Sequence, residues 1–208
     1  ISIDQQFDLP EEKESNNGII KYPNVDIEYN GFNLKALGGR IFNNGSINVI
    51  LGKNGTGKSS FIHKLATELG YSVSIKPQYP NLDKLLAKYP NITVQNFIHI
   101  FVQTKDETFR NDVLNTINVK HIMDKQVSKL SGGELQKISI IYCLGKKADI
   151  YMIDEPSASL DIHQRINVTR AIKRYMMNKH KIAFIIEHDI TMSFILSNNV
   201  NSRVIIFK

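Results

Sequence analysis

Residues 47–59, Ile47-Asn-Val-Ile-Leu-Gly-Lys-Asn-Gly-Thr-Gly-Lys-Ser59, indicate the fold class of this chain. A short apolar run ends at Gly52 in a glycine loop of the pattern G-x-x-x-x-G-K-S, and apolar residues at helical spacing follow it. Glycines let backbone N–H groups turn inward, and the following helix directs its positive dipole end at the same point. The stretch therefore predicts a loop that binds the phosphates of a nucleotide, between a buried strand and a helix.

The rest of the chain extends this pattern into an α/β fold. We expect strands over 19–29, 32–41, 47–51, 71–75, 150–153, 182–186 and 204–207, and helices over 59–69, 94–101, 109–116, 135–144 and 162–178. The first two strand regions alternate apolar residues around glycines, which is typical of antiparallel pairing. The later strands alternate with helices, which indicates a parallel sheet. The stretch of about 80–145 predicts an inserted helical subdomain.

The composition is typical of a globular domain that binds an anionic partner and does not insert into a membrane. The chain has 208 residues, 42% of them hydrophobic, which suits one domain or one core with a subdomain. The net charge of +6 suits an anionic partner, ATP or nucleic acid, although scattered lysines leave a solvated basic surface as the alternative. No apolar run approaches the roughly 18 residues that span a bilayer, so we expect no membrane insertion.

Two further features concern the setting of the chain. The single cysteine, Cys143, lies in an apolar run and is expected to be a buried hydrophobe. It excludes an intrachain disulfide and is consistent with a reducing, cytoplasmic location. Residues 1–18 are polar and do not begin with Met, so we expect a tail or linker of an excised fragment rather than a signal peptide.

An acidic pair follows the predicted strand 150–153. Asp154 and Glu155 would lie at the carboxyl edge of the sheet, where ligands bind in open α/β folds. We expect Asp154 to hold Mg²⁺, directly or through water, and Glu155 to act as general base on an attacking water. Taken alone, the pair could also be a solvated N-cap before Pro156.

The glycine loop itself supplies the other phosphate and metal groups. Lys58 is expected to bridge the β- and γ-phosphates, and the Ser59 hydroxyl to coordinate Mg²⁺. The predicted ATP-binding residues of the loop are Asn54, Gly55, Thr56, Gly57, Lys58, Ser59 and Ser60.

A third motif, Leu130-Ser-Gly-Gly-Glu-Leu-Gln136, lies between these two. Ser131, Gly132 and Gly133 open the predicted helix 135–144, and a serine with two glycines at a helix N-terminus is a second anion site. A helix cap without any ligand is the alternative.

The order of these three motifs resembles that of the ATP-binding-cassette (ABC) ATPases, over about residues 19–208. The resemblance implies a P-loop (RecA-like) nucleotide-binding domain whose cofactors are ATP and Mg²⁺. It also implies that Ser131, Gly132 and Gly133 contact the γ-phosphate of an ATP held by a second cassette of the parent chain.

Four further residues match motifs of that family. Gln78, in Lys76-Pro77-Gln78, resembles the glutamine that senses Mg²⁺ and the attacking water. Asp161 ends Ser157-Ala-Ser-Leu-Asp161, which resembles the segment across the dimer interface. His188 resembles the histidine that contacts the γ-phosphate. Tyr22 is the expected platform for adenine.

Tyr29 and Phe32 remain candidates for that platform, and any of the three aromatic residues could instead be a core residue of its strand.

Several segments are similar to subfamily E, the soluble RNase L inhibitor and ribosome-recycling ATPases, and more to their second cassette than to their first. They are Glu134-Leu135, 74–78, 143–158 and 187–189, with Gly55-Thr-Gly57. This resemblance implies ribosomal subunits and translation factors as partners. With a single cysteine, the chain is expected to lack that subfamily's iron–sulfur domain as well as the first cassette.

The chain also departs from the subfamily. Lys53 stands where an acidic residue is expected and Lys137 where an arginine is expected, and 80–125 matches poorly. The ATP-binding subunit of a membrane ABC transporter and a nucleotide-binding scaffold without hydrolysis remain alternative functions.

Overall fold

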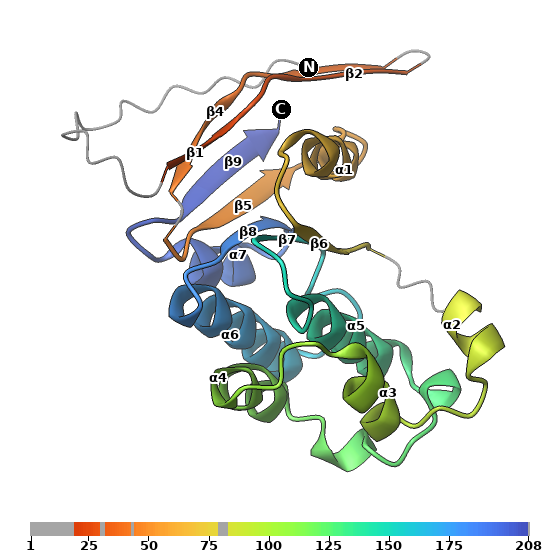
Figure 1. Ribbon diagram of the computed structural model, residues 1–208. Helices are drawn as coiled ribbons and strands as arrows, with labels where there is room; N and C mark the ends of the chain where they lie inside the picture. The colour runs from red at the N-terminus through yellow and green to blue at the C-terminus, as the bar shows by residue number, and fades with distance from the viewer. Residues whose placement is uncertain (1–18, 30–31, 43, 79–82, 208) are drawn as a thin grey trace.

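The centre of the molecule is a parallel sheet of five strands in the order β6–β7–β8–β5–β9 (Figure 1). The computed structural model describes residues 19–29, 32–42, 44–78 and 83–207. The sheet strands are β5 (Ile47–Gly52), β6 (Val73–Lys76), β7 (Ile150–Asp154), β8 (Ile182–Ile186) and β9 (Arg203–Phe207). Because all five are parallel, the loops that follow β5, β6, β7 and β8 gather at one edge of the sheet.

The sheet separates two hydrophobic cores. Successive side chains of a strand point to opposite faces, so β7 directs Met152 to one core and Tyr151 to the other. β8 does the same with Phe184 and Ile185. Both strands are buried along their whole length, which explains why their sequences are continuous apolar runs rather than alternating ones.

The first core packs beneath the N-terminal strands and α1 (Lys58–Glu68). The strands form two antiparallel pairs, β1 (Ile19–Tyr22) with β4 (Gly39–Phe42) and β2 (Val25–Tyr29) with β3 (Phe32–Ala36). The sequence predicted two longer strands, 19–29 and 32–41. Both predicted strands are interrupted at the point where the backbone of Gly38 approaches residues 22–24. The Gly38 N–H donates to Asn24 Oδ1 at 2.6 Å, and a Cβ on Gly38 would lie 2.6 Å from the Tyr22 carbonyl oxygen.

The second core packs under three helices, α5 (Gly132–Leu144), α6 (Ile162–Asn178) and α7 (Ile190–Ser197). It continues into the helical region between β6 and β7. That region contains α2 (Asp83–Lys88), α3 (Val94–Phe101), α4 (Glu107–Phe109), η1 (Arg110–Asn115), η2 (Lys120–Ile122) and η3 (Val127–Lys129).

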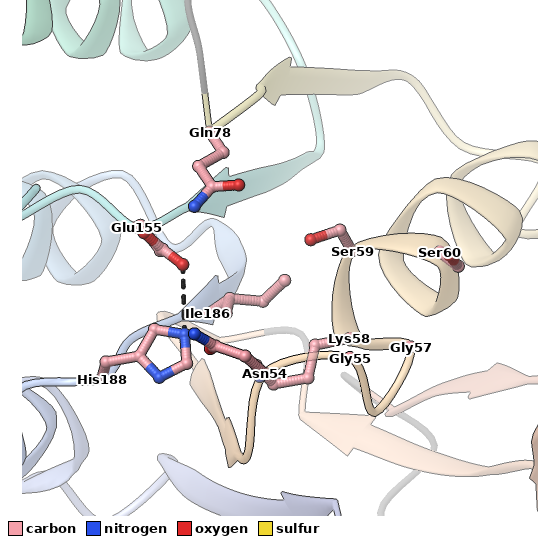
Figure 2. A pocket seen from close by; sticks show the side chains of 10 residues that line it. All are labelled: Asn54, Gly55, Gly57, Lys58, Ser59, Ser60, Gln78, Glu155, Ile186 and His188. Carbon is pink, nitrogen blue, oxygen red and sulfur yellow. Dashed lines mark ion pairs between the residues drawn. The ribbon is translucent and has the colours of Figure 1, made fainter.

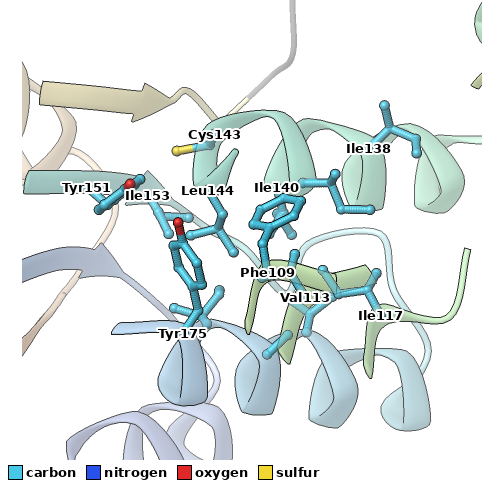
Figure 3. Packing of buried hydrophobic residues seen from close by; sticks show 14 of the residues in the cluster. Phe109, Val113, Ile117, Ile138, Ile140, Cys143, Leu144, Tyr151, Ile153 and Tyr175 are labelled. Atoms are coloured by element: carbon cyan, nitrogen blue, oxygen red, sulfur yellow. The ribbon is translucent and has the colours of Figure 1, made fainter. Parts of the chain in front are cut away.

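The helical region and the sheet share this core (Figure 3). Phe109 and Val113 of α4–η1 pack with Ile140 of α5 and Tyr175 of α6. The rings of Phe109 and Tyr175 meet edge to face at 5.7 Å. The α/β fold with N-terminal antiparallel strands confirms the predicted fold class, whereas the division of the chain into a tail, a domain and a subdomain stays a prediction. Residues 1–18 lie outside the described part of the chain.

Some predicted elements differ in detail. The helix predicted over 109–116 is a short α-turn that continues as a π-helical turn over 110–115. β6 begins at Val73, not at residue 71, because Tyr71 is 45% exposed and outside the sheet. α5 begins at Gly132, three residues earlier than predicted, because Ser131 caps it. The helix α7 was not predicted from the sequence; Asp189 caps it by accepting the N–H groups of Thr191 and Met192.

Candidate functional site

A cavity of about 630 Å³ opens where the loops after β5, β6, β7 and β8 meet (Figure 2). Its size is within the usual range for a small-molecule site. Its lining residues are Asn54, Gly55, Gly57, Lys58, Ser59, Ser60, Gln78, Glu155, Ile186 and His188. The fold thus brings the predicted phosphate loop together with three predicted residues from distant parts of the chain.

The glycine loop is shaped by backbone that only glycine adopts at low cost. Gly55 and Gly57 have φ angles of 79° and 86°. Lys58 is 6% exposed, and its Nζ donates to the carbonyl oxygens of Gly52 and Lys53 at 2.9 and 2.7 Å. Burial lowers the pKa of Lys58, and the carboxylates of Glu155 and Asp154 oppose that effect.

Thr56 also belongs to this loop. Its hydroxyl donates to the Lys53 carbonyl at 2.8 Å, and its side chain is 9% exposed. Thr56 does not line the cavity, and its side chain bonds within the loop; its contact with ATP stays a prediction.

Ser59 and Asp154 form the oxygen-rich part of the site. The Ser59 hydroxyl donates to Asp154 Oδ2 at 2.6 Å, and Asp154 is 2% exposed. Burial raises the pKa of Asp154, and the bond from Ser59 opposes the rise. Within the described ranges, the buried Oδ1 of Asp154 has no hydrogen-bond partner.

This donor set fits Mg²⁺. The ion takes hard oxygen ligands, and it is commonly held by one or two carboxylates together with waters and substrate phosphates. Asp154 suits that arrangement, because its Oδ2 is bonded to Ser59 and its Oδ1 has no partner among the described residues. Residues 19–29, 32–42, 44–78 and 83–207 contain no cluster of three His, Cys, Asp or Glu side chains that could form an all-protein metal cage.

Glu155 occupies a strained position directly after β7. Its φ of 47° is in the left-handed region, which is costly for a residue other than glycine and is often found at functional sites. Its N–H donates to the Ile186 carbonyl at 2.9 Å, and Gln136 Nε2 donates to its carbonyl at 2.7 Å. These bonds hold the backbone so that Glu155 Oε1 lies 3.1 Å from His188 Nε2 (Figure 2).

The Ser131 segment forms a separate site at the start of α5. The Ser131 hydroxyl accepts the Glu134 N–H at 3.3 Å, while Glu134 Oε2 accepts the Ser131 N–H at 2.9 Å. Ser131 and Gly132 are exposed, and neither they nor Gly133 line the cavity. In this chain alone, the segment and the glycine loop therefore do not share one ligand.

The segment that ends at Asp161 packs against this second site. Asp161 is exposed and caps α6, because its Oδ1 accepts the Gln164 N–H at 2.9 Å. Ser159 has a φ of 60°, and a Cβ on Gly133 would lie 2.9 Å from its carbonyl oxygen. Only glycine allows α5 to approach the turn at Ser159 so closely.

Tyr22, the predicted adenine platform, does not line the cavity. It is 8% exposed, and a Cβ on Gly39 would lie 2.8 Å from Tyr22 Cζ, so the ring covers that glycine in the first core. In this structure Tyr22 is a core residue of its strand, which was the alternative left open by the sequence. Its contact with adenine stays a prediction. The side chains of Tyr29 and Phe32 lie outside the described part of the molecule.

Sequence reasoning missed two buried polar residues at this edge. Lys76, 1% exposed, donates from Nζ to the carbonyl oxygens of Asp154 and Pro77 at 2.9 and 3.0 Å. Burial lowers the pKa of Lys76 to about 8, against the attraction of Asp154. Glu187 is 2% exposed, and its Oε1 accepts the His188 N–H at 2.8 Å. A charged residue at the end of an apolar strand was the available signal for both.

The sequence matches the ABC transporter family over residues 40–158. It is 42% identical to ABC transporter E family member 3 of Arabidopsis thaliana, over 69% of this chain and 85% of that protein. It is 37% identical to translation initiation factor RLI1 of Saccharomyces cerevisiae, over 95% of this chain and 32% of that protein. The chain thus spans about a third of the length of RLI1.

A solved structure shows the same fold. The crystal structure of the archaeal ribosomal stalk protein aP1 in complex with the archaeal ribosome recycling factor aABCE1 contains a chain with a TM-score of 0.79 and 30% identity. The match covers 98% of this chain and 39% of that one. No helix in the described ranges is both long and apolar enough to cross a membrane.

Proposed function

The chain belongs to the ABC transporter family and, within it, to subfamily E, and we propose on that basis that it is an ATP-hydrolysing cassette of a protein that acts in ribosome recycling and translation initiation. Membership of the family implies that the chain binds ATP. The observation that carries the proposed hydrolysis is the convergence of Glu155 and His188 on the cavity formed by the glycine loop.

The polar groups at this edge of the sheet have separate parts in the proposed reaction. The glycine-loop N–H groups and Lys58 bind the phosphates, since they form a cradle of positive charge at the start of α1. Ser59, Asp154 and Gln78 would hold Mg²⁺, which neutralises phosphate charge when bound. Glu155 Oε1 takes a proton from the attacking water, and His188 Nε2, 3.1 Å away, orients that carboxylate.

The second half of the proposed site comes from another cassette. Ser131, Gly132, Gly133 and Asp161 would face an ATP held by that cassette, because none of them lines the cavity of this chain. The capping geometry of Ser131 supports this role: its oxygen accepts the Glu134 N–H, so the exposed side chain is held at the N-terminus of α5, where a helix attracts anions.

The test of the proposed catalysis is Glu155→Gln in the parent protein. The variant should bind ATP as before, since the glycine loop is unchanged, and should lose about 10² to 10⁴-fold in turnover, because an amide cannot accept the proton. ATP affinity by equilibrium titration and phosphate release measure the two effects. Glu107→Gln, on the exposed start of α4, is the matched control. Normal turnover by Glu155→Gln would refute the role of Glu155.

The proposed role in translation rests on RLI1 and on aABCE1, whose names assign them to initiation and recycling. The test is co-sedimentation of the parent protein with ribosomal subunits in the presence of a non-hydrolysable ATP analogue. ATP-dependent sedimentation with subunits is expected. Recovery with membranes instead of ribosomal subunits would favour the ATP-binding subunit of a transporter.

A further inference from the structure

Glu187 is a buried acid between β8 and His188 whose carboxylate joins two separate segments of the site. Its side chain is 2% exposed. Its Oε1 accepts the Ser157 hydroxyl at 2.8 Å, the His188 N–H at 2.8 Å and the Asp189 N–H at 3.1 Å. One oxygen atom therefore holds both the turn that carries His188 and the segment that follows Glu155.

The bonds to the turn orient His188. A buried carboxylate is costly unless it is hydrogen-bonded, and bonds from N–H groups to a charged oxygen are stronger than neutral ones. Because two consecutive N–H groups point at Glu187 Oε1, the backbone at His188 follows the position of that oxygen. The imidazole of His188 then reaches Glu155 Oε1, 3.1 Å from its Nε2.

The bond from Ser157 to Glu187 joins the turn of His188 to residues 157–161, a segment that begins buried and ends exposed. Ser157 is 5% exposed, whereas Ser159 and Asp161, two and four residues later, are exposed. The same segment touches the start of α5, where a Cβ on Gly133 would lie 2.9 Å from the Ser159 carbonyl oxygen. A partner that displaces the exposed part of this segment would therefore act on Glu187 through one group, the Ser157 hydroxyl.

We propose that Glu187 is a positioning residue that transmits contacts of a partner cassette, made on residues 157–161, to the His188–Glu155 pair. The proposal rests on the proposed function, since it requires hydrolysis at Glu155 and a second cassette. The path runs from the segment through the Ser157 hydroxyl to Glu187 Oε1, and from there through two N–H groups to the turn of His188. ATP binding by the glycine loop does not depend on it.

The sharpest variant is Ser157→Ala. Replacing Glu187 itself would leave two N–H groups and a hydroxyl buried without an acceptor, and the fold would lose stability. Ser157→Ala removes only the link and leaves the bonds of Glu187 to the turn. Ser193→Ala is the matched control: Ser193 is also buried, at 4% exposed, and its hydroxyl donates to the Asp189 carbonyl at 2.8 Å on the other side of the same turn.

In the parent protein with both cassettes, we expect Ser157→Ala to lower turnover about tenfold while the affinity for ATP stays within twofold, because one hydrogen bond of this size corresponds to about that factor. Ser157→Thr, which keeps a hydroxyl, should restore turnover, and Ser193→Ala should leave it unchanged. Phosphate release and ATP titration are measured on each variant.

A double-mutant cycle separates transmission through His188 from a general effect on folding. Ser157→Ala should have no further effect on turnover in a His188→Ala background, whereas two independent defects would multiply. Multiplied defects, or wild-type turnover by Ser157→Ala, would overturn the proposal. Failure of the proposed function is distinct, since the unmodified protein would then show no turnover in the same assay.

Discussion

The carboxylate of Glu134 accepts hydrogen bonds from Lys125 Nζ at 2.7 Å and from the Ser131 N–H at 2.9 Å. These two bonds, with Lys125 the larger cause, hold the pKa of Glu134 at about 2, well below its ordinary 4.5. A single side chain thus closes the capping box of α5 and attaches it to the helical region. The exposed Ser131 is therefore held at a helix terminus by bonds within the chain.

This pKa gives a pH-dependent contribution to stability. Because the pKa is lowered by folding, the contribution is complete above pH 4.5 and is lost as the pH falls toward 2. Lys125 is half exposed, so solvent screening reduces the contribution to about 1 kcal/mol. We expect Glu134→Gln to lower the free energy of unfolding by this amount at pH 7, with a smaller difference at pH 3.

Urea unfolding of both proteins from pH 7 to pH 3 measures the difference. Glu107→Gln serves as the control, since Glu107 is an exposed residue at the start of α4. A difference that stays constant across this range would show that the effect of Glu134→Gln is not caused by its charge.

At the scale of elements, the junction of β5 with the glycine loop depends on a close approach of β9. Gly52 has a φ of 154°, and a Cβ there would lie 2.6 Å from the Phe207 carbonyl oxygen and 2.8 Å from Phe207 Cβ. Gly55, three residues later, has a φ of 79° but open space around it. The first glycine is required for packing between strands, and the second only for its backbone conformation.

We therefore expect Gly52→Ala to be more destabilising than Gly55→Ala. Overpacking against β9 together with backbone strain should cost about 3 kcal/mol at Gly52, whereas strain alone should cost about 1 kcal/mol at Gly55. The free energy of unfolding in urea measures both. Equal losses for the two variants would mean that β9 moves away from Gly52 at little cost.

At the scale of the whole molecule, the two predicted anion sites of the chain are separate. The glycine loop lines the cavity, while Ser131 lies outside it and is exposed. We expect the chain alone to bind ATP and to hydrolyse it slowly, because Ser131 does not line the cavity of its own chain. Turnover should rise when the first cassette of the parent protein is added, and Ser131→Ala in this chain should reduce that rise.

Phosphate release, measured against the concentration of the chain with and without the added cassette, tests this expectation. The affinity of the chain for ATP, titrated separately, should not change with Ser131→Ala, since that residue is outside the cavity. Fast turnover by the chain alone that increases with the square of its concentration would instead indicate that two copies of this chain form the site.

Local chemistry was readable from the sequence. The glycine loop at Gly52 and the acidic pair Asp154–Glu155 are contiguous patterns, and the buried strands are short apolar runs, so each was predictable without knowledge of the rest of the chain. The helix α7 was missed because its apolar residues lie on both sides, with Ile190 and Phe194 exposed and Met192 and Leu196 buried, which removes the helical period from the pattern.

The sequence by itself therefore determined the fold class, the phosphate loop and the family resemblance, because those depend on residues that are neighbours in the chain. Only the tertiary structure decided the strand order that brings Gln78, Glu155 and His188 to one cavity, and the contacts of Glu187 with Ser157. It also decided that the ring of Tyr22 packs over Gly39. The physical reason is that burial and hydrogen bonding are settled between segments far apart in sequence, where no local pattern specifies which side chains meet.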